Sequence, residues 1–141
     1  MKNPVLLLFS LLLPAVYTFA QSTQMVQFNG LEGKKGQLYI GWYRHEEDFM
    51  HPDKAVFKKI IPVTGLPTVE VAFDSIPDGT YAITVFLDKN NNGVLDKNAF
   101  GIPKEEYGFS NNARPLTRPA NFNEAKFEVK GKGAPWPITV K

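Results

Sequence analysis

Apolar and polar residues alternate with a period of two along most of the chain beyond residue 24. This alternation is typical of β-strands with one buried face, and it is clearest in residues 80–87, directly after a Pro-Asp-Gly turn signal at 77–79. Helical periods are weak, and the one helical candidate, residues 46–59, is interrupted by Pro52. The pattern predicts about seven short strands, within residues 25–31, 38–43, 55–63, 69–73, 80–87, 125–129 and 135–140.

Short strands separated by turn signals indicate an all-β protein, an antiparallel β-sandwich. We expect an immunoglobulin-like or transthyretin-like type, the latter because Gly79-Thr80-Tyr81 resembles a strand of transthyretin-like modules. Residues 21–141 contain no repeat or linker and are long enough for one hydrophobic core, so we expect a single domain. Trp42 and Trp136 lie within predicted strands, and we expect both in the core rather than on a sugar-binding surface.

Residues 1–20 predict a signal peptide. Lys2 provides a positive start, residues 5–13 form an apolar run too short to span a bilayer comfortably, and small residues end at Ala20. We expect cleavage before Gln21 and export to the periplasm or the external medium. An uncleaved anchor is the alternative.

The composition narrows the classes of function. The chain has no cysteine, which excludes disulfides, thiol catalysis and zinc–thiolate sites. Without Lys2, 15 of the 16 basic residues remain against 14 acidic ones, a formal charge of +1. Such a balance argues against electrostatic binding to nucleic acid or an anionic membrane. No second long apolar segment follows, so we expect no membrane insertion. The sequence does not identify a partner, and a cell-surface glycan or protein is the candidate.

Residues 88–98 carry the most informative motif. Oxygen-bearing side chains occupy loop positions 1, 3, 5, 9 and 11, and Gly93 occupies position 6. Calcium takes six to eight oxygen ligands, and alternate side chains converge on it when the backbone turns sharply at such a glycine. The motif therefore predicts a calcium site. Its predicted ligands are the side chains of Asp88, Asn90, Asn92, Asp96 and Asn98 and the backbone carbonyl of Val94.

This loop departs from an EF-hand. Position 12 is Ala99 instead of a bidentate glutamate, and the preceding segment has a strand pattern. We expect a strand-borne loop completed by Glu105 or Glu106, with a dissociation constant of about 0.1–1 mM. The alternative is a plain turn without metal, because an Asn-Gly pair and Asx-turns also explain this composition.

The glycine-rich and aromatic stretch 101–114 predicts a long ordered loop. Tyr107, Phe109 and Arg114 are candidate contacts for a sugar or a peptide. In the alternative interpretation, the two aromatic residues pack into the core and Arg114 pairs with a loop carboxylate. In that case the loop is ordered by its own side chains and needs no ligand.

Residues 78–86, 88–93, 101–114 and 122–127 together resemble a secreted bacterial family catalogued as domain of unknown function 2141. The most specific string is Tyr-Gly-Phe-Ser-Asn-Asn-Ala-Arg, which ends at Arg114. The family pattern then tends to run through glycine and paired prolines, and this chain departs from it there. The resemblance implies export and a small β-sandwich, and it implies no established activity.

Catalytic motifs are absent from the sequence. His45 and His51 lie in an acidic stretch but lack the spacing of a zinc site, and there is no G-x-S-x-G nucleophile elbow. We therefore predict an exported, non-enzymatic β-sandwich module with a calcium loop. The second hypothesis is a carbohydrate- or peptide-binding module that uses residues 101–114 without metal.

Overall fold

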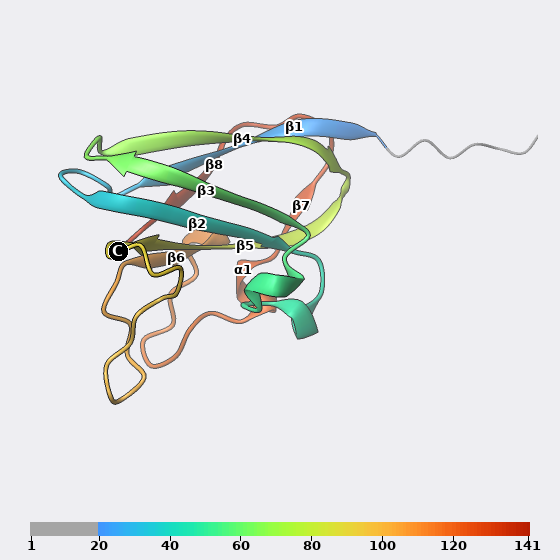
Figure 1. The fold of residues 1–141 in the computed structure, drawn as a ribbon. Coiled ribbons are helices and arrows are strands. Elements are labelled where there is room, and N and C mark those ends of the chain that lie inside the picture. Colours follow the sequence, from blue (N-terminus) through green and yellow to red (C-terminus); the bar gives the residue numbers. More distant parts are fainter. Residues whose placement is uncertain (1–19) are drawn as a thin grey trace, which may run out of the picture.

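The computed structural model describes residues 20–141, so the signal peptide predicted for residues 1–20 lies, apart from Ala20, outside the described part. Eight strands and four short helices follow one another along the chain (Figure 1). The strands are β1 (Gln21–Asn29), β2 (Lys35–Tyr43), β3 (Phe57–Thr64), β4 (Thr68–Pro77), β5 (Gly79–Asp88), β6 (Tyr107–Phe109), β7 (Phe127–Val129) and β8 (Trp136–Thr139). The helices are η1 (Glu46–Asp48), η2 (Pro52–Lys54), η3 (Ser110–Asn112) and α1 (Phe122–Ala125).

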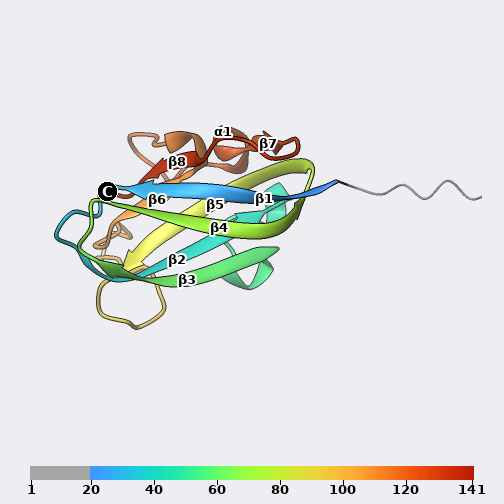
Figure 2. The same ribbon diagram turned by 90° about the horizontal axis from the view of Figure 1, so that it is seen from above.

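Two sheets form a sandwich, as predicted. One has the strand order β4-β1-β8 and the other β3-β2-β5-β6, while β7 pairs with the start of β5. Figure 2 shows β1 and β4 lying over β2 and β5. All pairs are antiparallel except β1 with β8, which are parallel. One strand, β6, was not predicted and lies inside the stretch predicted as a loop. Three residues with a central glycine carry too little alternation to indicate a strand.

The main core lies between the inner faces of the sheets. Trp42 is fully buried there, and its ring lies 5.2 Å from Phe73 and 5.5 Å from both Tyr81 and Phe127. Trp136 is partly buried against the same cluster, 4.3 Å from the Phe127 ring. The expectation that Trp42 is a core residue is confirmed, while Trp136 packs against the core but stays partly exposed. Burial of such large aromatic surfaces is a major source of stability.

A second, smaller cluster covers the outer face of the five-stranded sheet at one end. Tyr43 on β2, Phe49 after η1, Phe109 on β6 and Phe122 on α1 pack together there. Residues 46–59, the helical candidate, contain two separate 3₁₀ turns and the start of β3, and Pro52 begins the second turn. Proline is accepted at that first position because its missing N–H would have no partner there.

A capping box begins α1, which has Asn121 as its N-cap. The Asn121 side chain accepts a hydrogen bond from the Glu124 N–H, and Glu124 accepts one from the Asn121 N–H. Arg118 adds two hydrogen bonds of 2.8 Å to the same carboxylate. The Arg118 guanidinium and the Asn121 N–H lower the pKa of Glu124 from 4.5 to about 2.

This pKa predicts a pH-dependent effect of Glu124→Gln. The folded value is below the unfolded one, so the stabilisation is fully present above about pH 4.5 and is lost as the pH falls through about 2. The variant should melt below the wild type at neutral pH, and the two melting curves should converge near pH 2. Glu70→Gln, at an exposed position without an ion pair in residues 20–141, is the control. A difference that is the same at all pH values would contradict the prediction.

Candidate functional site

The calcium-type motif begins where β5 ends. From Asp88 the chain leaves the sheet as a long loop, residues 89–106, and returns as β6 beside β5. Figure 1 shows this loop projecting from the body of the sandwich. The motif is thus the first half of a long excursion between paired strands, and no two-residue hairpin turn joins those strands.

Asp88 is fully buried beneath the loop. Its Oδ1 accepts a hydrogen bond from the Asn92 N–H at 3.2 Å, and its Oδ2 accepts one from the Gly93 N–H at 2.8 Å. Gly93 has a φ of +79°, and Gly36, with a φ of +130°, lies against the Asp88 carbonyl, where a Cβ atom would collide with it. Two glycines therefore permit the sharp turn and the close approach of β2.

The next polar side chains of the motif turn back on the loop. The Asn90 Oδ1 accepts from the Asn92 N–H at 3.2 Å, and the Asn92 Oδ1 accepts from the Val94 N–H at 3.0 Å. Both side-chain amides donate hydrogen bonds to the Asp96 carboxylate, at 2.6 Å from Asn90 and at 2.9 Å from Asn92. Four of the predicted ligands, Asp88, Asn90, Asn92 and Asp96, therefore belong to one hydrogen-bonded group.

Glu105 joins this group from the returning half of the loop. It is 7% exposed, and its carboxylate accepts hydrogen bonds from the Lys89 N–H at 2.8 Å and the Asp96 N–H at 3.0 Å. Glu106 points the other way, to Lys34 at 3.5 Å and Lys89 at 2.6 Å. Burial raises the pKa of Glu106, but the Lys89 hydrogen bond, a backbone hydrogen bond and the charges of Lys34 and Lys89 together outweigh it, and the pKa lies below 4.5. Of the two glutamates considered, only Glu105 faces the loop.

Two predicted ligands have other surroundings. The Asn98 Oδ1 accepts hydrogen bonds from the Phe100 N–H at 2.9 Å and the Ile102 N–H at 3.0 Å, so it closes its own turn further along the loop. Val94 has an exposed side chain, and its N–H is bonded to Asn92. Asn98 therefore does not join the hydrogen-bonded group at the base of the loop, and the Val94 carbonyl remains a candidate ligand.

The charge of this group is not balanced by cations. Among residues 20–141, no lysine, arginine or histidine forms an ion pair with Asp88, Asp96 or Glu105. Over the same residues, no three carboxylate or histidine side chains stand close enough to hold a metal ion by themselves. Any metal bound here would need the asparagine oxygens and backbone carbonyls as well.

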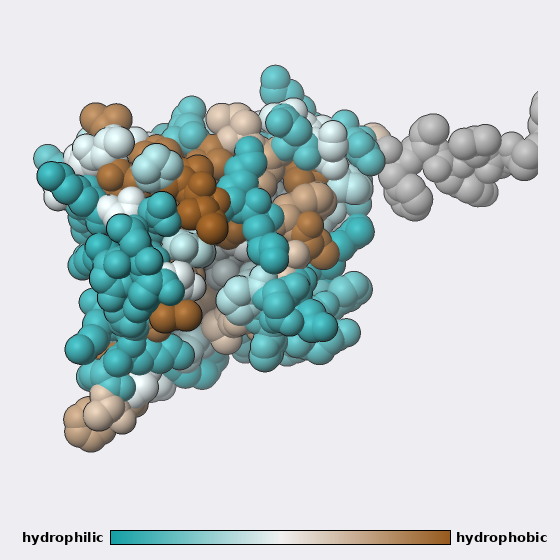
Figure 3. All heavy atoms as spheres, in the orientation of Figure 1, coloured by the Kyte–Doolittle hydropathy of each residue, from teal (hydrophilic) through white to brown (hydrophobic). Residues whose placement is uncertain are grey.

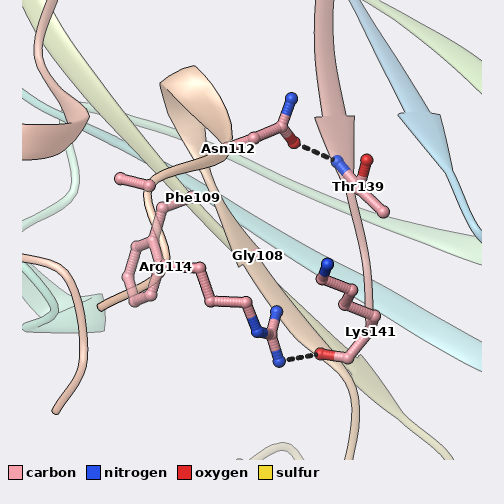
Figure 4. Close-up of a pocket in the computed structure, with 7 residues that line it drawn as sticks. Gly108, Phe109, Asn112, Arg114, Thr139 and Lys141 are labelled. Carbon is pink, nitrogen blue, oxygen red and sulfur yellow. Dashed lines mark hydrogen bonds between the residues drawn. The ribbon is translucent and has the colours of Figure 1, made fainter. Parts of the chain in front are cut away.

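The side chains of residues 107–114 form hydrogen bonds to backbone groups of distant segments, two of which are drawn in Figure 4. The Ser110 Oγ, which is buried, accepts from the Ile83 N–H at 2.8 Å and donates to the Ala125 carbonyl at 2.5 Å. Asn111 donates to the carbonyls of Glu124 and Lys126. The Asn112 Oδ1 accepts from the Thr139 N–H at 2.7 Å. We call residues 107–114 the clasp, because they join β5, α1 and β8.

The candidate ligand contacts are part of the clasp. Phe109 is buried, and the Arg114 guanidinium lies 4.5 Å from the centre of the Tyr107 ring. Arg114 also donates to the carbonyls of Tyr107 at 3.3 Å and Lys141 at 2.5 Å. Arg114 thus binds backbone carbonyl oxygens, whereas the alternative interpretation expected it to pair with a loop carboxylate. These internal contacts cover one face of the Tyr107 ring and use part of the hydrogen-bonding capacity of Arg114.

Two hollows were found beside the clasp and α1. The one in Figure 4 has a volume of about 60 Å³ between Gly108, Arg114 and Thr139, well below the 300–1,000 Å³ usual for ligand pockets. A wider, open hollow of about 370 Å³ is lined by apolar residues such as Phe49 and Phe122 together with the charged residues Glu46 and Arg118. Neither hollow contains His45 or His51, which are both exposed and do not cap the 3₁₀ turns that follow them.

The fold and the loop define a class of protein, a small β-sandwich module with a long polar excursion between two paired strands. The chain belongs to the family described as uncharacterized protein conserved in bacteria (DUF2141), whose model matches residues 26–135. No curated protein and no solved structure matched the chain. Within residues 20–141, no helix has the length and apolar character needed to cross a membrane.

Proposed function

We propose that this protein is an exported, non-enzymatic β-sandwich module whose 88–98 loop binds calcium, and that the ion rigidifies one end of the sandwich. The observation that carries the proposal is the burial of Asp88 and Glu105, at 0% and 7% exposure, without a cationic partner in residues 20–141. Buried carboxylates are costly unless they are paired with a cation or coordinate a metal. Asp96 adds a third negative charge to the same group.

The side chains around these carboxylates match the needs of calcium. Asp88, Asn90, Asn92 and Asp96 supply oxygens from one turn of backbone, the Val94 carbonyl occupies the position that EF-hand loops use, and Glu105 approaches from the other side. Hydrogen bonds from the two asparagine amides to Asp96 compete with an ion for that carboxylate. Calcium would replace those two bonds, which we expect to limit the affinity to a dissociation constant of about 0.1–1 mM.

Binding to the folded state alone would raise the melting temperature by mass action. For a dissociation constant near 0.5 mM, about 10 mM calcium should stabilise the protein by about 2 kcal/mol, which corresponds to roughly 4–8 °C. The experiment is thermal unfolding of residues 21–141 in EDTA and then in increasing calcium. Asp96→Asn is the test variant and should lose most of the rise.

Asp53→Asn, at an exposed position on η2, is the matched control and should keep the full rise. Magnesium at the same concentrations should have a smaller effect, because it prefers octahedral sites and retains its water. Overlapping wild-type curves up to about 10 mM calcium, or an equal rise in Asp96→Asn, would exclude the calcium proposal.

The second hypothesis, a glycan- or peptide-binding module at residues 101–114, has weaker support. A sugar needs an open ring face, but Arg114 covers one face of Tyr107 and Phe109 is buried. The hollow beside them, about 60 Å³, is also small for a sugar ring.

A further inference from the structure

The outer half of the projecting loop, residues 97–104, forms a tightly built arm. Lys97 and Pro103 face each other in an antiparallel bridge, the Asn98 N–H donates to the Ile102 carbonyl at 2.9 Å, and the Asn98 side chain binds two further N–H groups. The Lys104 N–H donates to the Asp96 carbonyl at 2.8 Å and so ties the arm to the base of the loop. The arm therefore presents its end in a defined conformation.

That end is apolar and open to solvent. Phe100 is 88% exposed and Ile102 is 59% exposed, and Val94 nearby in the sequence is 58% exposed. Figure 3 shows apolar residues at the extremity of the projection at lower left, beyond a mainly hydrophilic stretch of surface. A single exposed apolar side chain is common on protein surfaces, but Phe100 and Ile102 both stand on the same short ordered turn, and grouped exposed apolar residues mark sites of interaction.

The charges along the loop are separated. The arm carries Lys97 and Lys104, both exposed, and no acidic residue. The carboxylates lie at the base, where Glu105 is buried and Asp96 is half-buried. The formal charge of +1 for residues 21–141 argues against electrostatic binding of the chain as a whole to an anionic membrane. Lys97 and Lys104 nevertheless lie at the two ends of the arm, so the same folded arm carries two exposed positive charges and an exposed apolar end.

We propose that the arm docks onto an anionic lipid surface, with Phe100 and Ile102 entering the headgroup region and Lys97 and Lys104 contacting lipid phosphates. A convex end with two apolar side chains offers far less than the roughly 800 Å² per partner of a stable protein interface. A lipid interface requires no complementary pocket, accepts aromatic side chains at headgroup depth and attracts lysines. Calcium dependence of this docking rests on the proposed calcium site, since Asp96 belongs to both the site and the base of the arm.

The test is co-sedimentation of residues 21–141 with vesicles of phosphatidylcholine alone and of phosphatidylcholine with about 30% phosphatidylglycerol, in EDTA and in calcium. We expect binding to the anionic vesicles, weakened at least about fivefold by Phe100→Ser and by the pair Lys97→Glu and Lys104→Glu. Leu116→Ser, which removes a fully exposed leucine on another loop, should leave binding unchanged. All variants should melt close to the wild type, because the changed side chains are exposed.

The outcomes separate this proposal from the calcium site. No binding of the wild type at millimolar lipid, or equal binding of Phe100→Ser, would overturn the lipid proposal even if calcium raises the melting temperature. A protein partner for the same end of the arm would then be the remaining interpretation. Binding that requires Phe100 but is equal in EDTA and calcium would support the arm and leave calcium without a role in docking.

Discussion

Replacing Asp88 by alanine should destabilise the folded protein by about 1–3 kcal/mol even in EDTA, because the Gly93 N–H loses its acceptor. The carboxylate accepts from Gly93 at 2.8 Å and from Asn92 at 3.2 Å, and after the substitution the Asn92 N–H keeps only the Asn90 Oδ1. Asp88 is fully buried, so water does not readily take its place. Urea unfolding in EDTA measures the loss, and in calcium the difference from the wild type should increase, because the variant also loses the ion.

Asp96→Ala is the matched control for this prediction. Its carboxylate is half-buried and accepts from the exposed amides of Asn90 and Asn92, which can turn to water after the substitution. In EDTA it should cost less than about 1 kcal/mol, although it too should abolish the response to calcium. Equal stability of Asp88→Ala and the wild type in EDTA would show that the buried carboxylate does not organise the loop.

Ser110→Ala should have an effect of similar size through the clasp. The Ser110 hydroxyl is 2% exposed, accepts from the Ile83 N–H at 2.8 Å and donates to the Ala125 carbonyl at 2.5 Å. Alanine leaves both backbone groups buried without a partner, which should cost about 2–4 kcal/mol. The measurement is the urea midpoint, with an unchanged dependence of the free energy of unfolding on urea.

Thr117→Ala removes a hydroxyl from an exposed position in the 115–120 segment and should change stability by less than about 0.5 kcal/mol. Since the clasp is separate from the loop base, Ser110→Ala should retain the calcium-dependent rise in melting temperature. A Ser110→Ala protein as stable as Thr117→Ala would mean that the hydroxyl is not needed to join β5 to α1.

These two predictions assign different roles to the two stretches that make the sequence distinctive. The loop base around Asp88 concentrates negative charge that the described part of the chain leaves without cations, and on this observation we base the proposed ion site. The clasp instead satisfies its polar groups with backbone atoms from distant strands, and this is the property of a structural element. The specific string at 107–114 is therefore explained by folding, although the pattern alone also suited a ligand-binding loop.

The positions of most strands were determined by the sequence itself. Residues 80–87 alternate cleanly because every second side chain of β5 faces the core, and the same reason holds for β2. Gly93 in the Asp88 motif likewise predicted a sharp turn, and its φ of +79° agrees with that expectation. In each case the cause is local, since strand geometry and glycine conformational freedom operate over a few residues.

Other features were decided only by the tertiary structure. Whether Glu105 or Glu106 faces the motif depends on how a loop from Lys89 to Glu106 folds back on itself, and the alternation shows only that the two point to opposite sides. Asn98 fits the calcium spacing but closes its own turn.

Asn111 and Asn112, with φ values of 59° and 50°, adopt left-handed backbone that asparagine tolerates. Their partners lie at least 13 residues away along the chain. The sequence predicts the features that depend on neighbouring residues and not those that depend on contacts between distant segments. Periodic burial and backbone preferences act between near neighbours, whereas the partner of each polar side chain is selected when distant segments meet in the folded chain.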